Sequence, residues 1–383
     1  MTQGHARGRS PLRIGINVLF LLPGGVGGTE IYMRSLISAL AGADSRNDYF
    51  IFRNAETGPD IVPEAPNFHD RPQPVHAASR PARIAFEQTR LLIDVERLKL
   101  DIVFNGGFTA PLLCRAPMVT VFYDLQYRSH PQYARWFDRP FWNLLLPASA
   151  RRSRHIVTLS DSAKRDLTRF YPWAEDRIVL VPHGTERGFQ NVAARREARP
   201  PSKPMILSVS TLHPHKNIDT LLRAFVRFRE RRPEYRLVIC GLKGFETERL
   251  LRLRAQLQLE KDVDFTGWIP RADLYERFAQ TRAFVYPSRF EGFGIPVLEA
   301  LTAGVPTACS DIPPLREIAG DCARYFDPND DRAMAAALEN VTQDEALRHH
   351  LIRAGRDRSS MFTWDKGARR LRDVFERVAA REA

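Results

Sequence analysis

Short apolar runs alternate with amphipathic helical stretches along most of this sequence. In the first half, runs typical of buried strands occupy residues 13–22, 48–53, 101–105, 118–123, 155–159 and 178–181, and helical stretches occupy 29–40, 88–98 and 160–170. The second half repeats the alternation, with strand-like runs at 205–210, 235–240, 263–266 and 283–286 and helical stretches at 217–231, 246–258 and 364–380. Strands separated by helices are typical of parallel sheets that helices cover, so the sequence predicts an α/β fold.

The length of the chain and one break in its pattern indicate two domains. A chain of 383 residues is longer than one hydrophobic core usually serves. Residues 191–204 are charged, rich in proline and without hydrophobic periodicity, which is typical of a linker. The sequence therefore predicts a first domain at 1–190, a linker at 191–204, a second domain at 205–363 and a terminal helix at 364–383.

The composition is that of an ordinary globular protein, with 44% apolar and 27% charged residues. The chain contains no run of about 18 apolar residues that would span a membrane, and its N-terminus lacks the apolar core of a signal peptide. The cysteines are scattered without pairing or metal-ligand spacing, as expected of reduced residues: Cys114, Cys240, Cys309 and Cys322. We therefore expect a cytoplasmic protein.

The chain is basic, with a net charge of +12. Arginines are spread over most of the predicted helices, and no helix-turn-helix, zinc-finger or RNA-binding signature is present in the sequence, so nucleic acid is not the expected partner. A denser basic group at 151–155 follows an aromatic and aliphatic stretch at 136–146. This combination suits an anionic membrane surface, and it also suits a core helix followed by an exposed turn. The sequence leaves both interpretations open.

Two glutamates eight positions apart, Glu291 and Glu299, bracket a Gly-Phe-Gly loop and the start of a helix. Proline is favoured at the first helical position, so Pro296 predicts a helix entrance with Glu299 in its first turn. A helix entrance attracts anions, whereas ionised carboxylates accept hydrogen bonds from hydroxyl groups. This combination indicates a sugar nucleotide, and a helix-capping acid beside an unrelated surface glutamate is the alternative. The loop residues expected to contact the ligand are Gly292, Phe293, Gly294 and Ile295.

Two other turns have the composition of anion-binding sites. Four glycines between residues 24 and 28 connect the first strand to the first helix, and Gly27 and Gly28 are the best candidates for a ligand contact. Their spacing matches neither the dinucleotide nor the Walker pattern. Lys216 follows the first strand of the second domain, near a helix start where a cation is unfavourable unless an anion binds beside it. A plain turn and a surface lysine are the alternatives.

The segment 288–300 resembles the E-x7-E motif of retaining glycosyltransferase family 4. The likeness continues through 304–311 and 314–320, which follow the motif in that family as a strand and a loop. The resemblance implies the GT-B fold, in which two Rossmann-like domains with parallel sheets face each other across a cleft and a C-terminal helix crosses back onto the N-terminal domain. It also implies that Glu291 contacts hydroxyls of the donor sugar and that Glu299 holds the ribose of the nucleotide. The N-terminal domain is then the acceptor side, and the C-terminal domain binds the nucleotide sugar.

The resemblance covers the diphosphate-binding elements, with departures. Gly27 and Gly28 correspond to the loop that faces the donor phosphates, and Lys216 lies in the loop that binds the diphosphate. Thr211 stands where many family members have an arginine. Neutralisation of the diphosphate is therefore expected to depend on Lys216 or on Arg289.

A second departure lies at the end of the strand 118–123. Many members of the family have a His-Asp pair there, and the histidine contacts the donor sugar, whereas this chain has Tyr123 and Asp124. A tyrosine forms hydrogen bonds but does not carry a proton at neutral pH. Either Asp124 takes more of the polar role, or the histidine is dispensable.

The resemblance also supplies the functional expectation. The sequence looks most like bacterial mannosyltransferases of polysaccharide and O-antigen assembly, which implies retaining transfer of mannose from GDP-mannose to a glycan or lipid-linked acceptor at the inner face of the cell membrane. Glu291, Lys216 and Asp124 are the expected catalytic residues, with no metal ion and no cofactor. A UDP-hexose or deoxyhexose donor, a phosphorylase-like or epimerase-like enzyme of the same fold, and a non-catalytic carbohydrate-binding protein remain open, as does the oligomeric state.

Overall fold

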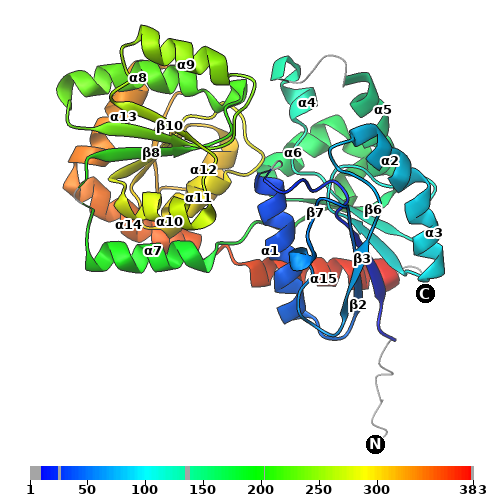
Figure 1. The fold of residues 1–383 in the computed structure, drawn as a ribbon. Coiled ribbons are helices and arrows are strands. Elements are labelled where there is room, and N and C mark those ends of the chain that lie inside the picture. The colour runs from blue at the N-terminus through cyan, green and yellow to red at the C-terminus, as the bar shows by residue number, and fades with distance from the viewer. Residues whose placement is uncertain (1–9, 25–26, 134–138, 202, 381–383) are drawn as a thin grey trace, which may run out of the picture.

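The computed structural model describes residues 10–24, 27–133, 139–201 and 203–380, and these form two α/β domains that lie side by side (Figure 1). The first domain contains a seven-stranded sheet in the order β3-β2-β1-β4-β5-β6-β7, and the second contains a six-stranded sheet in the order β10-β9-β8-β11-β12-β13. The strand pairs of both sheets are parallel. The predicted α/β class is confirmed.

The elements of the first domain follow the predicted alternation. Its strands are β1 Arg13–Asn17, β2 Asp48–Arg53, β3 Phe68–Pro72, β4 Ile102–Asn105, β5 Met118–Val121, β6 Ser153–Thr158 and β7 Ile178–Leu180. Its helices are α1 Gly28–Ala43, α2 Arg80–Gln88, α3 Arg90–Arg97, α4 Gln126–Ser129, α5 Arg139–Arg152 and α6 Asp161–Phe170, and α15 Trp364–Ala380 packs on it from the end of the chain.

The second domain repeats the arrangement with one strand fewer. Its strands are β8 Met205–Val209, β9 Arg236–Cys240, β10 Val263–Gly267, β11 Ala283–Tyr286, β12 Thr307–Ser310 and β13 Arg324–Phe326. Its helices are α7 Arg187–Ala198, α8 Ile218–Arg231, α9 Thr247–Gln256, α10 Arg271–Gln280, α11 Ile295–Thr302, α12 Pro313–Ala319, α13 Asp331–Gln343 and α14 Glu345–Ser359.

The strand order reverses once in each sheet, between β1 and β4 in the first and between β8 and β11 in the second. Ligands of open parallel sheets bind outside the carboxyl ends of the strands at such a reversal. The turns that follow β1, β8 and β11 contain the glycine loop, Lys216 and Glu291 respectively. The topology therefore brings the residues that the sequence singled out to the reversal points of the two sheets.

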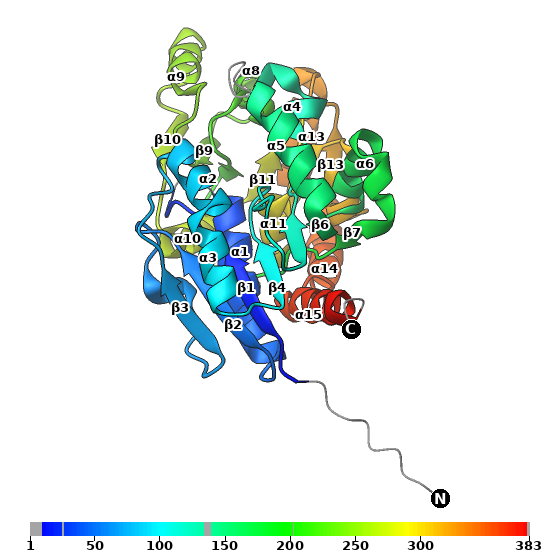
Figure 2. The same ribbon diagram turned by 90° about the vertical axis from the view of Figure 1, so that its right-hand side faces the viewer.

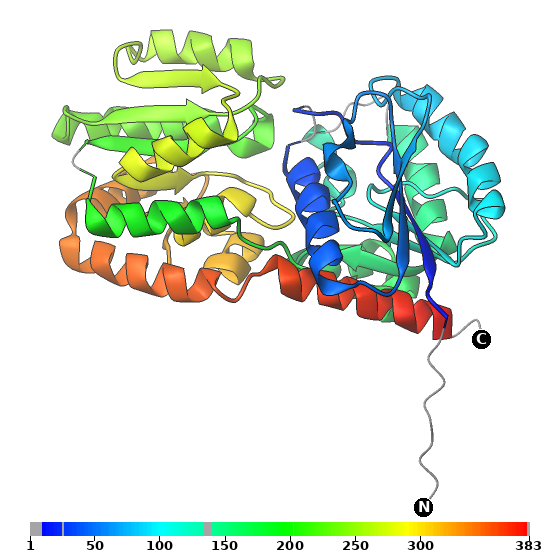
Figure 3. The ribbon, with the colours of Figure 1, turned by 60° about the horizontal axis from the view of Figure 1, so that its bottom comes forward.

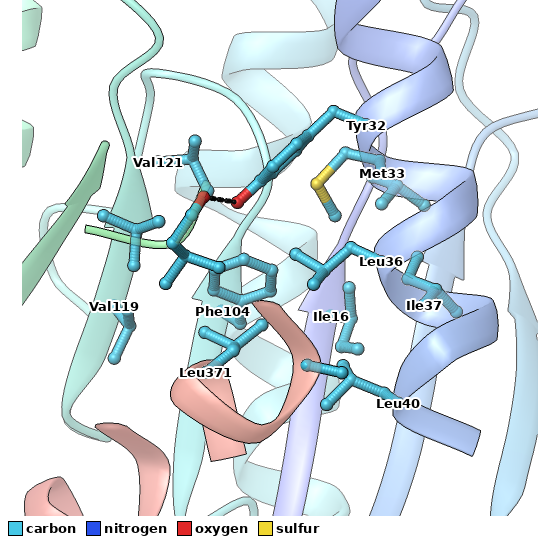
Figure 4. Close-up of a cluster of buried hydrophobic side chains, with 14 of the residues drawn as sticks. Ile16, Tyr32, Met33, Leu36, Ile37, Leu40, Phe104, Val119, Val121 and Leu371 are labelled. Carbon is cyan, nitrogen blue, oxygen red and sulfur yellow. Dashed lines mark hydrogen bonds between the residues drawn. The ribbon is translucent and has the colours of Figure 1, made fainter. Parts of the chain in front are cut away.

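The last helix, α15, leaves the second domain and packs along the first, as Figure 3 shows. Its buried side chains recur at the spacing of one helical face: Leu371, Val374, Phe375 and Val378. The ring of Phe375 lies edge-on to Phe104 of β4 at a centroid distance of 5.6 Å. Figure 4 shows Leu371 in the same apolar cluster as Leu36 and Leu40 of α1. The predicted return of the C-terminal helix to the N-terminal domain is confirmed.

The linker prediction is wrong in position, because residues 187–198 form helix α7. Phe189 and Val192 of this helix are buried against the second domain. The buried Arg196 takes a place on the same face, where its guanidinium donates hydrogen bonds to the carbonyls of Phe278 at 2.8 Å and Thr281 at 2.7 Å. Because an arginine occupies a core-facing position, the sequence of α7 does not show the apolar periodicity that is typical of a helix. The chain crosses between the domains before α7 rather than after it.

Three other boundaries differ from the prediction. Helix α11 begins at Ile295 with Gly294 as its N-cap, so Pro296 is its second residue and Glu299 its fifth, one residue deeper than expected. Residues 313–319 form α12, where the family likeness implied a loop. Strand β1 ends at Asn17, well before residue 22.

The aromatic and aliphatic stretch at 136–146 forms α5 from Arg139 onward, and residues 136–138 lie outside the described residues. Leu145 and Leu146 are buried, whereas Phe141 and Leu144 are 41% and 77% exposed. Helix α5 lies with α2 on the side of the first domain that faces away from the second (Figures 1 and 2). Within the described ranges, no helix is both long enough and apolar enough to span a bilayer.

The docking of α15 predicts a stability effect at one position. Replacement of Phe375 by Ala should lower the free energy of unfolding by about 3–5 kcal/mol, because it empties a fully buried aromatic site. The exposed Arg370 on the same helix is the matched control, and its replacement by Ala should change the value by less than about 0.5 kcal/mol. Urea unfolding followed by circular dichroism measures both, and equal effects of the two substitutions would contradict the packing described here.

Candidate active site

A cavity of about 740 Å³ lies between the two domains at the carboxyl ends of their sheets. The first domain lines it with the start of α1 and with Asp124, and the second lines it with the turns after β8, β9, β10 and β11. The cavity brings together all but one of the residues singled out in the sequence: Gly27, Gly28, Tyr123, Asp124, Thr211, Lys216, Glu291, Gly292, Phe293, Gly294, Ile295 and Glu299. The exception is Arg289.

A nearly buried ion pair lies at the reversal point of the second sheet. The ammonium of Lys216 donates to Glu291 Oε1 at 2.6 Å and to the hydroxyl of Tyr286 at 3.0 Å. The two charged side chains keep only 14% and 10% of their surface exposed. Removal of one partner of such a pair leaves the other as an uncompensated buried charge, so each residue fixes the position and charge of the other.

The neighbouring charges set the protonation of the three acidic and basic groups at this end of the cavity. Burial raises the pKa of Glu291, but the ammonium of Lys216 outweighs burial and holds that pKa below its usual value. Burial raises the pKa of Asp124, and the charge of Glu291 adds to this effect. Burial and the charge of Lys216 lower the pKa of His215 to about 3, so its imidazole is neutral at physiological pH. Lys216 is therefore the cation of this turn.

A second cluster of charged residues surrounds Glu299. The sequence predicted Glu299 as a site residue but not the residues that bind it. Its Oε1 accepts a hydrogen bond from Arg271 at 2.5 Å, and the same guanidinium binds Glu186 at 2.6 and 3.0 Å. The hydroxyl of Tyr275 donates to Glu186 at 2.6 Å. Glu186 belongs to the segment that crosses between the domains, so Arg271 connects that segment to the base of the cavity.

Arg271 and Glu186 line the cavity but were missed from the sequence. Arg271 is the first residue of α10, and a cation at a helix entrance is unfavourable without an anion beside it. The same argument identified Lys216 and was available for Arg271. Glu186 carried no local signal, because its partner lies 85 residues away in the sequence.

Two helix entrances face each other across the cavity. Helix α1 has Gly27 as its N-cap at φ 55°, and helix α11 has Gly294 as its N-cap at φ 112°, a backbone region that favours glycine. A Cβ on Gly28 would lie 2.8 Å from Ile295 Cδ1. The first N–H groups of a helix have no partner within the helix, and they attract anions. Glycine is thus favoured by the backbone of the two turns, and Gly28 marks a point where the two domains lie close together.

Direct contacts hold the domains together around the cavity. Ser160 donates to the carbonyl of Gly292 at 2.6 Å while its side chain caps α6. The carboxylate of Glu317 on α12 accepts from the backbone N–H groups of Asp161 and Ser162 at 2.7 and 2.9 Å. A Cβ on Gly292 would lie 2.5 Å from the carbonyl oxygen of Tyr123. These contacts define a closed arrangement of the two domains.

Three predicted ligand contacts are not supported by the side-chain positions. The hydroxyl of Tyr123 donates to the carbonyl of Gly106 at 2.8 Å, away from the ligand, and its ring packs among aromatic neighbours. The guanidinium of Arg289 reaches Thr220 and Asn329 and does not line the cavity. The ring of Phe293 is buried, where it packs edge-on to Phe362. Tyr123 and Phe293 therefore contribute to the cavity through their place in the backbone.

Two other residues that the sequence singled out, Asp124 and Thr211, line the cavity. Asp124 lines the cavity, and its Oδ1 accepts from the backbone N–H of Gln126 at 2.9 Å, which fixes the carboxylate. Thr211 lines the cavity at the start of the turn that ends with Lys216. Its neutral hydroxyl cannot replace the charge of an arginine, so Lys216 provides the positive charge of this turn.

Two parallel α/β domains that face each other across a cleft, with a C-terminal helix that crosses back, define a protein of the GT-B class. Comparison with known families agrees: residues 26–188 match the model described as Glycosyltransferase Family 4, and residues 190–358 match Glycosyl transferases group 1. The chain belongs to glycosyltransferase family 4, and it is a glycosyltransferase.

Relatives and solved structures agree with this assignment. The chain is 29% identical over 356 residues to O-antigen chain mannosyltransferase B of Escherichia coli, covering 87% of this chain and 92% of that protein. It is 28% identical over 255 residues to O-antigen chain mannosyltransferase RfbU of Salmonella typhimurium, covering 66% and 68%. Its fold is similar to that of sucrose-phosphate synthase from Thermosynechococcus elongatus, with a TM-score of 0.79, 20% identity and coverage of 97% and 100%. It is also similar to WaaG, a glycosyltransferase of lipopolysaccharide biosynthesis, with a TM-score of 0.74, 17% identity and coverage of 95% and 99%.

The carboxylates around Arg271 predict a pH-dependent loss of stability in Arg271→Ala. Burial raises the pKa of Glu299 even with Arg271 present, and loss of the guanidinium raises it further. The unfolded chain releases this proton near pH 4.3, whereas the native variant retains it to higher pH. The free energy of unfolding of the variant therefore falls as the pH rises from about 4.3 toward neutrality, relative to the original protein.

The expected deficit at pH 7 is about 2–3 kcal/mol, below the value of ~3–5 kcal/mol for a fully buried pair because the Arg271 side chain keeps 31% of its surface exposed. Arg195→Ala is the matched control, since Arg195 of α7 pairs with Glu276 of α10 in an exposed position; its expected effect on stability is small. Urea unfolding at pH 5 and pH 7 measures both variants. A deficit that is independent of pH, or no larger than that of the control, would contradict the buried network.

Proposed function

We propose that this glycosyltransferase transfers a hexose, with retention of configuration, from a nucleoside-diphosphate sugar to a glycan or lipid-linked glycan of a cell-surface polysaccharide. Mannose from GDP-mannose is the proposed donor. The observation that carries the proposal is the Lys216–Glu291 pair, which provides a cation for a diphosphate and an ionised carboxylate for sugar hydroxyls at one point of the cleft. The names of the relatives, which are O-antigen mannosyltransferases, support the choice of mannose.

The phosphate groups of the donor bind between Lys216 and the two helix entrances. A lysine ammonium has three hydrogen-bond donors, of which Glu291 and Tyr286 accept two. The third remains for a phosphate oxygen, and the entrances of α1 and α11 add backbone N–H groups and their dipoles. These groups stabilise the negative charge that develops on the diphosphate as the glycosidic bond breaks. The positive charge comes from the protein, so the proposal includes no metal ion and no cofactor.

The two glutamates hold the hydroxyl-bearing parts of the donor. Glu291, kept ionised by Lys216, accepts hydrogen bonds from hydroxyls of the sugar. Glu299 is bonded to Arg271 through Oε1, and it uses Oε2 to accept from the ribose hydroxyls. Arg271 opposes the effect of burial on the pKa of this carboxylate and orients it. One carboxylate oxygen is thus bound to the protein, and the other is available to the ligand.

The transfer needs no covalent intermediate with the protein. The bond between the anomeric carbon and the β-phosphate oxygen breaks, the acceptor oxygen attacks the same face of the sugar, and its proton passes to the departing phosphate. Asp124, held by the backbone N–H of Gln126, orients a hydroxyl beside the reacting carbon. The contacts between the domains, such as that of Ser160 with Gly292, exclude water and so limit hydrolysis of the donor.

The proposal places the reaction in the cytoplasm, at the inner face of the cell membrane, where a lipid-linked acceptor is accessible. The surface offered to anionic lipid is the outer face of α5. Phe141 and Leu144 are exposed there, and Arg151 and Arg152 lie in the last turn of the same helix. Exposed apolar side chains and basic residues on the same helix suit the boundary of an anionic bilayer.

Substitutions at the ion pair test the proposed roles. Glu291→Ala should abolish transfer, and Lys216→Ala should reduce kcat by about 10²–10³ and weaken donor binding, because stabilisation of the leaving group is lost. Lys261→Ala, an exposed lysine away from the cavity, is the control and should leave the rate unchanged. Turnover of the donor gives the rates, and circular dichroism verifies the fold. Near-normal transfer by Glu291→Ala would refute the site assignment.

The donor can be identified by thermal stabilisation, because a ligand that binds only the native state raises the melting temperature. A panel of GDP-mannose, UDP-glucose, UDP-galactose, GDP-fucose and dTDP-rhamnose at equal concentration, in buffer with EDTA, should give the largest shift with GDP-mannose. A larger shift with a UDP-sugar would replace mannose by that hexose. A shift that requires a divalent metal ion would contradict the metal-independent site.

A further inference from the structure

Gln126 of the first domain binds the second domain beside the Lys216–Glu291 pair. It is the first residue of the short helix α4, and its side-chain amide nitrogen lies 2.8 Å from Nδ1 of His215. His215 immediately precedes Lys216 in the turn after β8. The partners are 89 residues apart in the sequence and belong to different domains, so this hydrogen bond depends on how the two domains are placed.

The protonation of His215 fixes the direction of this hydrogen bond. Burial and the charge of Lys216 lower the pKa of His215 to about 3, so the imidazole is neutral at physiological pH. A neutral imidazole has one nitrogen that donates and one that accepts, whereas the amide nitrogen of a glutamine only donates. Gln126 therefore donates to Nδ1 of His215, and the imidazole hydrogen lies on Nε2.

His215 also connects the turn of Lys216 to the turn of Glu291. Its carbonyl oxygen accepts from the backbone N–H of Arg289 at 2.8 Å and from the hydroxyl of Ser288 at 3.1 Å. Both of these residues lie just before Glu291 in the turn after β11. The imidazole of His215 is thus bound to the first domain and its carbonyl to the second turn, so its position affects both turns that form the ion pair.

The backbone of Gln126 binds a further charged group of the cavity. Its N–H donates to Asp124 Oδ1 at 2.9 Å. Asp124 lines the cavity from the first domain, and Lys216 lines it from the second. One residue therefore holds Asp124 through its backbone and the neighbour of Lys216 through its side chain.

A second contact of the same segment reaches the residue before Glu291. His130 follows the last residue of α4, and its imidazole packs against the ring of Phe290 at a centroid distance of 4.6 Å. Phe290 is buried and directly precedes Glu291. Helix α4 and its C-cap thus contact the second domain at the residue before each member of the ion pair.

We propose that Gln126 is a positioning residue that fixes Lys216 relative to Asp124 in the closed arrangement of the two domains. Neither Gln126 nor His215 is among the described residues that line the cavity, so both act through the charged groups beside them. The inference rests on the proposed function, because it takes Lys216 as the cation that stabilises the leaving diphosphate. Such stabilisation depends on where the positive charge lies relative to the developing negative charge. Loss of the hydrogen bond therefore slows the reaction and leaves nucleotide binding nearly unchanged.

Turnover of the donor tests the proposal, with GDP-mannose or whichever nucleotide sugar of the panel stabilises the protein most. Gln126→Leu, which removes the donor group at similar size, should lower kcat about threefold to tenfold, the fold-change that corresponds to one hydrogen bond. Its affinity for the nucleoside diphosphate, measured by calorimetry, should change by less than about twofold. Gln343→Leu is the matched control, because Gln343 donates to the hydroxyl of Tyr235 at 3.1 Å within the second domain, and it should keep the original kcat.

Substitutions of His215 distinguish this hydrogen bond from a general loss of packing. The amide oxygen introduced by His215→Asn can accept in place of Nδ1, so this variant should retain most of kcat. His215→Leu should lose about as much as Gln126→Leu. The variant with both Leu substitutions should be no slower than either single variant, because each substitution removes the same interaction.

The positioning role would be overturned by an unchanged kcat in Gln126→Leu, or by effects of Gln126→Leu and His215→Leu that add in the double variant. A fall in melting temperature and nucleotide affinity together with kcat would indicate a general structural role and would also overturn it. Failure of the original protein to bind any nucleotide sugar would instead overturn the proposed function itself.

Discussion

The ion pair between Lys216 and Glu291 is the constraint on which the site depends. A carboxylate and an ammonium, both largely removed from water, are tolerable only if each has its partner and further polar contacts. The turn after β8 and the turn after β11 supply the two charges, and these turns meet because their strands are neighbours at the point where the strand order reverses. The ordinary geometry of a parallel sheet thus creates a site in which an anion and a hydroxyl can be recognised side by side.

The first domain completes this site with the start of α1, with the carboxylate of Asp124 and with close contacts at glycine residues. Gly292 lies against the backbone of Tyr123 at a distance that leaves no room for a Cβ, and Gly28 lies against the side chain of Ile295. Glu317 caps α6 across the same boundary. Close packing at these points explains how two domains with separate cores enclose one cavity, and α15 adds a covalent return between them. The proposed donor binds at Lys216, Glu291 and Glu299 of the second domain, and the start of α1 and Asp124 line the cavity from the first domain.

Much of this could be predicted from the sequence, because the informative signals were local. The alternation of strands and helices defined the α/β class, and the cation at Lys216 and the two glutamates were visible within short segments. Arg271 was overlooked although it stands at a helix entrance, and its pairing was hidden because its two partners lie 28 and 85 residues away in the sequence. The sequence also does not show in which direction a side chain points. Tyr123 donates a hydrogen bond to Gly106, and Arg289 donates one to Thr220, although both residues were predicted to contact the donor. Helix α7 was missed because a buried Arg196 bonds to carbonyls where an apolar residue was expected.

The central claim is that one nucleotide sugar lies along the cavity in a fixed direction, from Glu291 to Glu299. A crystal structure of the protein with GDP-mannose tests this claim most directly. The account predicts a phosphate oxygen within hydrogen-bond distance of Lys216 Nζ, sugar hydroxyls on Glu291 and ribose hydroxyls on Glu299. A donor bound in the reverse direction, or outside the cleft between the two domains, would contradict it.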